Sequence, residues 1–122
     1  MMPGNEQAMG HLILDQDKLP TNSGAREWEG YLFEETNVSL ILVDVPPGEG
    51  PRLHRHPYEE VFVVHEGQAV YTIGSTAVVV HAGQIVIVPK GMPHKFVNSG
   101  PGRLRQTDIH LNKRFETEWL ET

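Results

Sequence analysis

Between residues 38 and 111 the chain is a series of short β-branched segments separated by turn residues. Segments such as 38–45 (VSLILVDV), 60–67 (EVFVVHEG) and 76–83 (TAVVVHAG) are rich in valine and isoleucine, which favour extended backbone. No helical period interrupts them, and Gly74-Ser75 forms a two-residue turn of the hairpin type. Short and evenly spaced strands of this kind predict an all-β antiparallel sandwich or barrel.

The remaining segments complete a single-domain organisation, which suits a chain of 122 residues. Further strands are expected at 68–73, 84–91, 94–100 and 103–111. Residues 1–37 are polar, with apolar islands at 11–14 (HLIL) and 31–33 (YLF), and are interpreted as an arm with one strand in it. This arm packs on the 38–111 barrel or on a partner chain.

Residues 112–122 are expected to form a short C-terminal helix. Asn112 is a residue type that caps helix N-termini well. Phe115 and Trp119 are four positions apart, which places them on the same face of a helix.

Composition excludes several classes of function. The chain contains no cysteine, which rules out disulfides, zinc-thiolate sites and cysteine nucleophiles. Its net charge is −6 and no basic block stands out, so neither nucleic acid nor an anionic membrane is an expected partner. No signal peptide and no apolar run of membrane-spanning length is visible, which predicts a soluble cytoplasmic protein.

The stretch PRLHRHPYEEVF (51–62) concentrates imidazoles and carboxylates just before an apolar run. Side chains alternate between the two faces of a strand, so His54 and His56 point the same way. If the strand continues, Glu60 also points to this face, because it is an even number of positions from His56. Glu59 is expected outward or at the rim. Two neutral imidazoles aimed at one point become ligands when a cation lies between them.

Two longer patterns resemble the signature motifs of the cupins. The first is Gly48-x5-His54-x-His56-x3-Glu60-x6-Gly67, and the second is Gly83-x5-Pro89-x-Gly91-x2-His94-x3-Asn98. Both match at every fixed position. The resemblance implies a double-stranded β-helix, or jelly-roll barrel, with a metal near its centre. It also implies the metal ligands His54, His56, Glu60 and His94.

Three neutral imidazoles and one carboxylate form a donor set of intermediate softness. Such a set suits one divalent transition-metal ion per chain, Fe, Mn, Ni, Zn, Co or Cu, better than Ca or Mg. Four protein ligands leave one or two positions open on a five- or six-coordinate ion. Water, substrate or O₂ can occupy such positions.

Three further residues are candidates for a substrate pocket. Phe62 is expected on the same strand face as Glu60, and Phe96 on the same face as His94. Both are therefore expected to line the cavity, although a purely structural core role is equally compatible. Arg52 is expected on the same strand face as His54, and its planar guanidinium fits a substrate carboxylate. The alternative, a solvated arginine, is the more common situation for this residue type.

The other four histidines are weaker candidates for metal ligands. His65 is expected on the outward face of its strand. Both His65 and His81 are expected at the surface or in sheet packing. His11 lies in the arm. His110 is compatible with two positions, inside the barrel or at the cap of the final helix.

The reaction stays open between two classes of function. One is a metal-dependent enzyme, most plausibly a dioxygenase-like oxidoreductase acting on a small polar molecule. The other is a non-catalytic module that binds a small molecule or a metal, and cupins also include isomerases and sugar-modifying enzymes. A homodimer is expected in either case, because edge strands and the apolar islands of the arm need covering.

Overall fold

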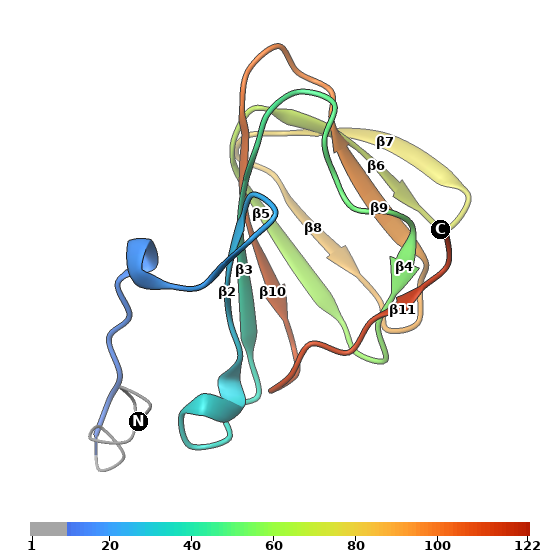
Figure 1. Ribbon diagram of the computed structural model, residues 1–122. Coiled ribbons are helices and arrows are strands. Elements are labelled where there is room, and N and C mark those ends of the chain that lie inside the picture. Colours follow the sequence, from blue (N-terminus) through green and yellow to red (C-terminus); the bar gives the residue numbers. More distant parts are fainter. Residues whose placement is uncertain (1–9) are drawn as a thin grey trace.

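Two antiparallel sheets form the body of the protein in a computed structural model that describes residues 10–122 (Figure 1). The first nine residues of the predicted arm lie outside this range. The six-stranded sheet has the order β1 (Thr21–Asn22), β2 (Ala25–Trp28), β3 (Ser39–Val45), β10 (Leu104–His110), β5 (Glu60–Glu66) and β8 (Ile85–Val88). The five-stranded sheet has the order β11 (Glu118–Trp119), β4 (His54–Arg55), β9 (His94–Asn98), β6 (Gln68–Ile73) and β7 (Thr76–His81).

The helical content of the described residues is two 3-10 turns, at Gln16–Lys18 and Gly30–Leu32. Each has three residues, so no helix in this part of the chain has the length and apolarity to cross a bilayer.

The core lies between the two sheets and follows from strand alternation. Inward residues of β5 and β9 supply Phe62 and Phe96, and β6 supplies Tyr71. The ring of Tyr71 packs edge-on against Phe62 at 5.3 Å and stacks on Phe96 at 5.5 Å. Truncating a buried aromatic side chain of this kind to alanine costs about 3–5 kcal/mol. These three rings therefore fill a large part of the space between the sheets.

The predicted hairpin is confirmed. Ile73 pairs with Thr76, so Gly74 and Ser75 form the two-residue turn between β6 and β7. Gly67, between β5 and β6, has a φ of 84°. A Cβ atom at this position would lie 2.3 Å from the carbonyl oxygen of Arg103, so glycine is required here for both conformation and space.

The predicted C-terminal helix is wrong. Residues 112–122 run in an extended path and include β11, which pairs with β4. The Leu120 N–H donates to the carbonyl oxygen of Leu53, so backbone groups that a helix would use internally are committed to another strand. The Asn112 side chain does not cap a helix and instead donates to the carbonyl oxygen of Arg114 and to Glu116.

The strand content of the arm also differs from expectation. The island at 11–14 forms no strand, and Ile13 is largely exposed. The strands lie later, in β1 and β2, and β2 pairs with β3 of the same chain. This pairing extends the six-stranded sheet beyond the region 38–111.

Candidate metal centre

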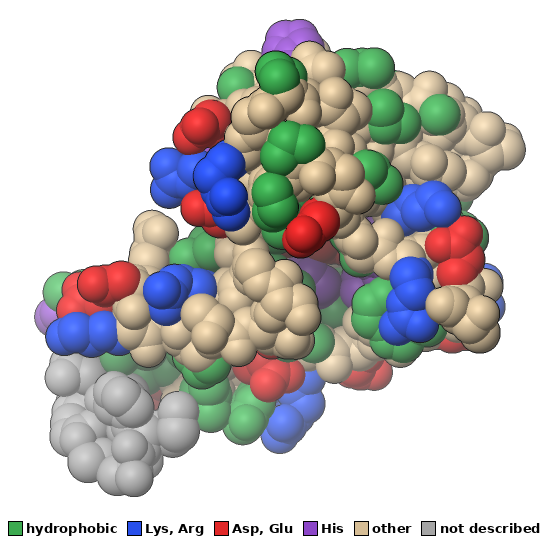
Figure 2. All heavy atoms as spheres, turned by 45° about the horizontal axis from the view of Figure 1, so that its top comes forward, with side chains coloured by type: hydrophobic (Ala, Val, Ile, Leu, Met, Phe, Trp, Pro, Cys, Tyr) green, Lys and Arg blue, Asp and Glu red, His purple; other side chains and the backbone are tan. Residues whose placement is uncertain are grey.

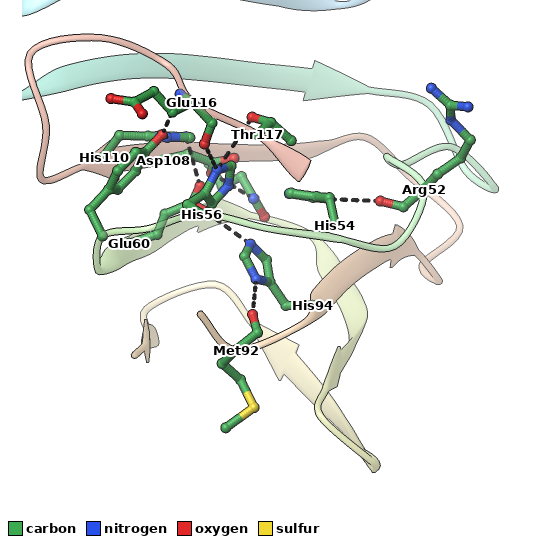
Figure 3. Close-up of polar contacts among 12 residues, drawn as sticks. Arg52, His54, His56, Glu60, Met92, His94, Asp108, His110, Glu116 and Thr117 are labelled. Carbon is green, nitrogen blue, oxygen red and sulfur yellow. Dashed lines mark hydrogen bonds and ion pairs between the residues drawn. The ribbon is translucent and has the colours of Figure 1, made fainter. Parts of the chain in front are cut away.

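Four side chains from three strand segments converge in the interior of the protein (Figure 3). His54 begins β4 and His56 follows it, while Glu60 begins β5 and His94 begins β9. All four are 7% exposed or less. One ligand atom of each lies within 4.8 Å of those of the others, so the four predicted residues form a possible metal site.

Each of the three imidazoles is oriented by a backbone carbonyl group. The Nδ1 atoms of His54, His56 and His94 lie 2.7, 2.9 and 2.9 Å from the carbonyl oxygens of Arg52, Glu116 and Met92 respectively. A carbonyl oxygen only accepts, so each Nδ1 carries the proton and donates. The three Nε2 atoms are thereby left as lone-pair donors, which is the tautomer a metal site needs.

Two of these Nε2 atoms, those of His56 and His94, lie close to one oxygen of Glu60. Oε1 of Glu60 lies 3.1 Å from Nε2 of His56 and 3.0 Å from Nε2 of His94. The Nε2 atom of His56 is buried and has no hydrogen-bond partner of good geometry among residues 10–122. Lone pairs that face a carboxylate oxygen repel it unless a cation lies between them. These donors therefore fit a bound metal ion.

The protonation states match those of metal ligands. Burial lowers the pKa of His54 to about 4, despite the opposing hydrogen bond to Arg52. Burial alone would raise the pKa of Glu60, but neighbouring histidines, His110 first among them, outweigh it and hold that pKa well below its usual value. At neutral pH the centre thus offers a neutral imidazole at His54 and a carboxylate at Glu60, and an ion need not displace protons from them.

His110 lies inside the barrel, which decides between the two positions that the sequence left open. Its Nε2 is 3.0 Å from Oε2 of Glu60, and its Nδ1 is 2.6 Å from the hydroxyl oxygen of Tyr58. That hydroxyl accepts a hydrogen bond from the Glu116 N–H, so its own proton is free to go to Nδ1. His110 then carries its proton on Nε2, which faces Oε2 of Glu60 at this distance but without the geometry of a hydrogen bond. The sequence signal for this inward position is that Asp108 and His110 are two residues apart, which places them on the same face of a strand.

Residues 112–122, here called the closing segment, form one wall of the site. Besides the carbonyl oxygen of Glu116, this segment places the Trp119 ring 5.0 Å from the His54 ring and the Phe115 ring 5.0 Å from that of His110. Exposed ion pairs at 2.7 Å and 3.0 Å tie it to the barrel through Arg55–Glu118 and Lys95–Glu121. Sequence reasoning missed this role because the same residues were assigned to a helix.

A cavity of about 830 Å³ reaches three of the four ligands, His54, His56 and Glu60. Figure 2 shows histidine side chains at the bottom of a hollow on this face. Phe62 and Phe96 line the cavity and are buried, with ring centroids 6.1 Å apart. Their predicted position is observed, and a contact with substrate stays a prediction.

Arg52 lines the rim of the cavity and not its interior. Its guanidinium lies over the Trp119 ring, 4.8 Å from the centroid, and points away from the ligand cluster in Figure 3. Its role in gripping a substrate therefore stays a prediction. His65, which bonds to Thr107 on the outer face of the sheet, and His81 are both exposed, and so is Glu59.

The chain matches the family model described as "Cupin domain" over residues 41–110. An uncharacterized protein of Streptomyces coelicolor is 36% identical over 81 residues, which cover 66% of this chain and 77% of that protein. An uncharacterized protein of Methanocaldococcus jannaschii is 30% identical over 70 residues, which cover 57% of this chain and 56% of that protein.

Similar solved structures include oxalate decarboxylases. That of Bacillus subtilis, studied for its Mn(II) centers, has a TM-score of 0.73 at 24% identity, covering 85% of this chain and 30% of that chain. A formate complex of the Lactobacillus farciminis enzyme has a TM-score of 0.71 at 23% identity, covering 84% and 33%. The chain spans about a third of these decarboxylases, and the likeness is one of fold. From the match over residues 41–110, the chain belongs to the cupin domain family.

Proposed function

We propose that the protein is a metal-dependent enzyme of the dioxygenase-like oxidoreductase type, which acts on a small molecule and uses one divalent transition-metal ion per chain. One observation carries the proposal: three imidazole Nε2 atoms and a carboxylate converge, buried, at a cavity that is open to solvent. Such a donor set leaves coordination positions free for a substrate oxygen. An ion held there supplies Lewis-acid and redox chemistry when bound.

The side chains around the centre have separate tasks in this proposal. His54, His56, Glu60 and His94 hold the ion. His110 keeps Glu60 oriented, and Phe62 and Phe96 exclude water from the reacting end of the cavity. Exclusion of water strengthens the electrostatic interactions between the ion and a bound substrate.

The choice among ions is supported by the donor set and by one neighbour. Imidazole and carboxylate together suit Fe, Mn, Co, Ni, Cu and Zn. The Bacillus subtilis oxalate decarboxylase has Mn(II) centers, which supports manganese as one member of this group. Because this chain spans only 30% of that enzyme, the decarboxylation reaction is not transferred to it.

The experiment is to strip the protein with a chelator, reload it with each of the six ions, and follow O₂ uptake and product formation with hydroxy-acids, sugars and catechol-like compounds. Ion-dependent turnover with O₂ consumption is expected. Turnover without O₂ would favour the isomerase or sugar-modifying alternative, and ligand binding without turnover would favour a non-catalytic module. Equal turnover in stripped and reloaded protein would reject the metal mechanism.

A matched pair of variants links this activity to the centre. Glu60→Gln removes the negative charge of a buried ligand and should abolish ion-dependent turnover. Glu59→Gln makes the same chemical change at the adjacent, exposed position and should leave it unchanged. Equal loss in both variants would contradict the assignment of Glu60.

A further inference from the structure

An apolar zone begins one residue step away from the donors of the metal centre. Side chains on the inward face recur at every second residue of a strand, about 7 Å apart. One such step leads from Glu60 to Phe62 on β5, and one leads from His94 to Phe96 on β9. Both rings line the cavity. Two strands, one from each sheet, thus turn apolar at the same distance from the ion-binding atoms.

Strand β3 supplies a third side of this zone through Ile41. Ile41 is the register partner of Asp108 on β10, and Asp108 is in turn the register partner of Phe62 on β5. The side chain of Ile41 packs against the core while it is only partly buried, and it lines the cavity. Ile41, Phe62 and Phe96, here called the apolar collar, therefore face the space beside the donors from both sheets.

The apolar lining continues along β3, away from the donors. Val43 and Val45 follow Ile41 on the same face of this strand, and both line the cavity. A cavity of about 830 Å³ has room for a ring-sized ligand. Each CH₂ group that a ligand buries on such a surface strengthens binding by about fourfold.

The collar offers a ligand few polar partners. Asp108 interrupts it, but Gln106 already donates to its Oδ1 atom at 2.7 Å. The Tyr71 hydroxyl is committed as well, because it donates to Gln106. Glu27 lies two strands from Asp108, on the half-buried strand β2. A ligand with hydroxyl groups all around its body would leave most of them buried without a partner, which is costly.

We propose that Ile41 is a specificity-determining residue, and that the substrate places a hydrocarbon or aromatic body against the apolar collar while oxygen atoms at its other end bind the ion. The substrate class is then a small carboxylate or phenol with a compact apolar body, and not a sugar or a polyhydroxylated acid. This inference rests on the proposed metal-dependent function and names its substrate class.

The test uses protein loaded with one equivalent of Co²⁺, with metal occupancy measured before any probe is added. Acetate, cyclohexenecarboxylate and shikimate are titrated while the Co²⁺ absorption is followed. Each has one carboxylate, and shikimate is the trihydroxylated form of cyclohexenecarboxylate. Cyclohexenecarboxylate should bind at least about tenfold more tightly than acetate, which corresponds to burial of about two CH₂ groups. Shikimate should bind at least about tenfold more weakly than cyclohexenecarboxylate.

A matched pair of variants on β3 assigns this preference to the collar. Ile41→Ala should weaken cyclohexenecarboxylate binding about fivefold, because it removes apolar contact area, and should change acetate binding by less than about twofold. Leu42→Ala makes the same kind of truncation at the next residue, whose side chain alternates to the opposite face of the sheet and lines a different cleft. It should leave both affinities unchanged.

Four results would overturn the inference: cyclohexenecarboxylate binding no tighter than acetate, shikimate binding as tightly as cyclohexenecarboxylate, equal losses in Ile41→Ala and Leu42→Ala, or no response of the Co²⁺ absorption to any probe. If Ile41→Ala fails to fold, Ile41→Val makes the same comparison with a smaller loss. Failure of the proposed function shows separately, as Ile41-dependent probe binding with no ion-dependent turnover. Ion-dependent turnover of sugars would overturn this inference and leave the proposed function in place.

Discussion

His54 and His94 are register partners across β4 and β9, and their ring centroids lie 4.5 Å apart. One belongs to the first sequence motif and the other to the second. The strand ladder, and not the ion, therefore fixes the separation of these donors. A one-residue slip of either strand would turn its histidine to the opposite face, so the metal centre depends directly on strand register.

His54→Ala should remove metal binding. Loss of a partner that only orients a ligand typically costs about 10–100-fold in affinity, and loss of the ligand itself should cost at least as much. Metal content after gel filtration measures this. His81→Ala, at an exposed position, should retain one ion per chain, and an undiminished metal content in His54→Ala would refute the assignment.

His110→Gln should weaken metal binding about 10–100-fold without removing a ligand of the predicted set. The reason is that His110 contacts Oε2 of Glu60 and holds the carboxylate toward the ion. Tyr58→Phe should have a smaller effect in the same direction, because it frees Nδ1 of His110. Competition with a chromophoric chelator gives the affinities. His65→Gln is the surface control. Equal metal affinity in His110→Gln and the wild type would contradict the role of His110 in orienting Glu60.

Asp108→Asn should stabilise the metal-free protein above about pH 4. In the unfolded chain this carboxyl group ionises near pH 4, at about its reference pKa of 3.9, whereas its pKa in the folded protein is raised. Between the two pKa values the folded state binds more protons, so the free energy of unfolding falls as pH rises, by at most about 1.4 kcal/mol per pH unit. Asparagine does not titrate and removes this loss.

The measurement is denaturant unfolding of both proteins between pH 5 and 8. The groups that face Asp108 are Glu60, Gln106, Tyr71 and His110, and they are the same in both proteins. The stability difference should grow with pH. A difference that shrinks as pH rises would contradict the neutral state of Asp108.

Deletion of residues 115–122 should lower metal affinity and speed metal exchange. It removes the carbonyl oxygen of Glu116 that orients His56 and the Trp119 ring that covers His54. Arg55→Ala breaks only an exposed ion pair of the closing segment and should leave affinity unchanged. Stopped-flow transfer of the ion to a chelator reports the exchange rate, and identical rates in the shortened and full chains would exclude a role for this segment.

We expect a homodimer that covers the outer face of the six-stranded sheet. Its edge strand β8 exposes Ile85 and Ile87, at 62% and 68%, and exposed apolar edges are prone to pair. Light scattering should give twice the chain mass of 13.7 kDa at micromolar concentration. Ile85→Lys with Ile87→Lys should give a monomer of unchanged fold, and a monomeric wild type would exclude the dimer.

The strands that could be predicted are those with a local signal. Alternating valine and isoleucine, together with the glycine turns, located β5, β6 and β10 within one or two residues of their observed ends. The strands β1, β4 and β11 have two residues each and are defined by their partners. No periodicity exists in so short a segment, so their sequences could not reveal them.

The four ligands could be predicted from the two motifs, but the residues around them could not. Strand alternation does not explain the agreement for Glu60, because β4 ends at Arg55 and β5 begins at Glu60 in the other sheet. The spacing of Phe115 and Trp119 suits one helix face, yet in the structure the two rings contact different histidines, His110 and His54. His110 and Asp108 are two positions apart, and strand alternation alone puts such residues on one face. It did not show that this face meets Glu60, because that contact depends on how β10 pairs with β5.

The contact between His56 and Glu116 sets an order of events during synthesis. A ribosome makes the ligand residues 54–94 first, but β10, which bridges β3 and β5, and the carbonyl oxygen that orients His56 come later. A nascent chain that has emerged only to residue 100 has its four donor side chains but lacks the central strand and the outer wall that position them. The folded geometry of the four donors therefore requires residue 116 to have left the exit tunnel.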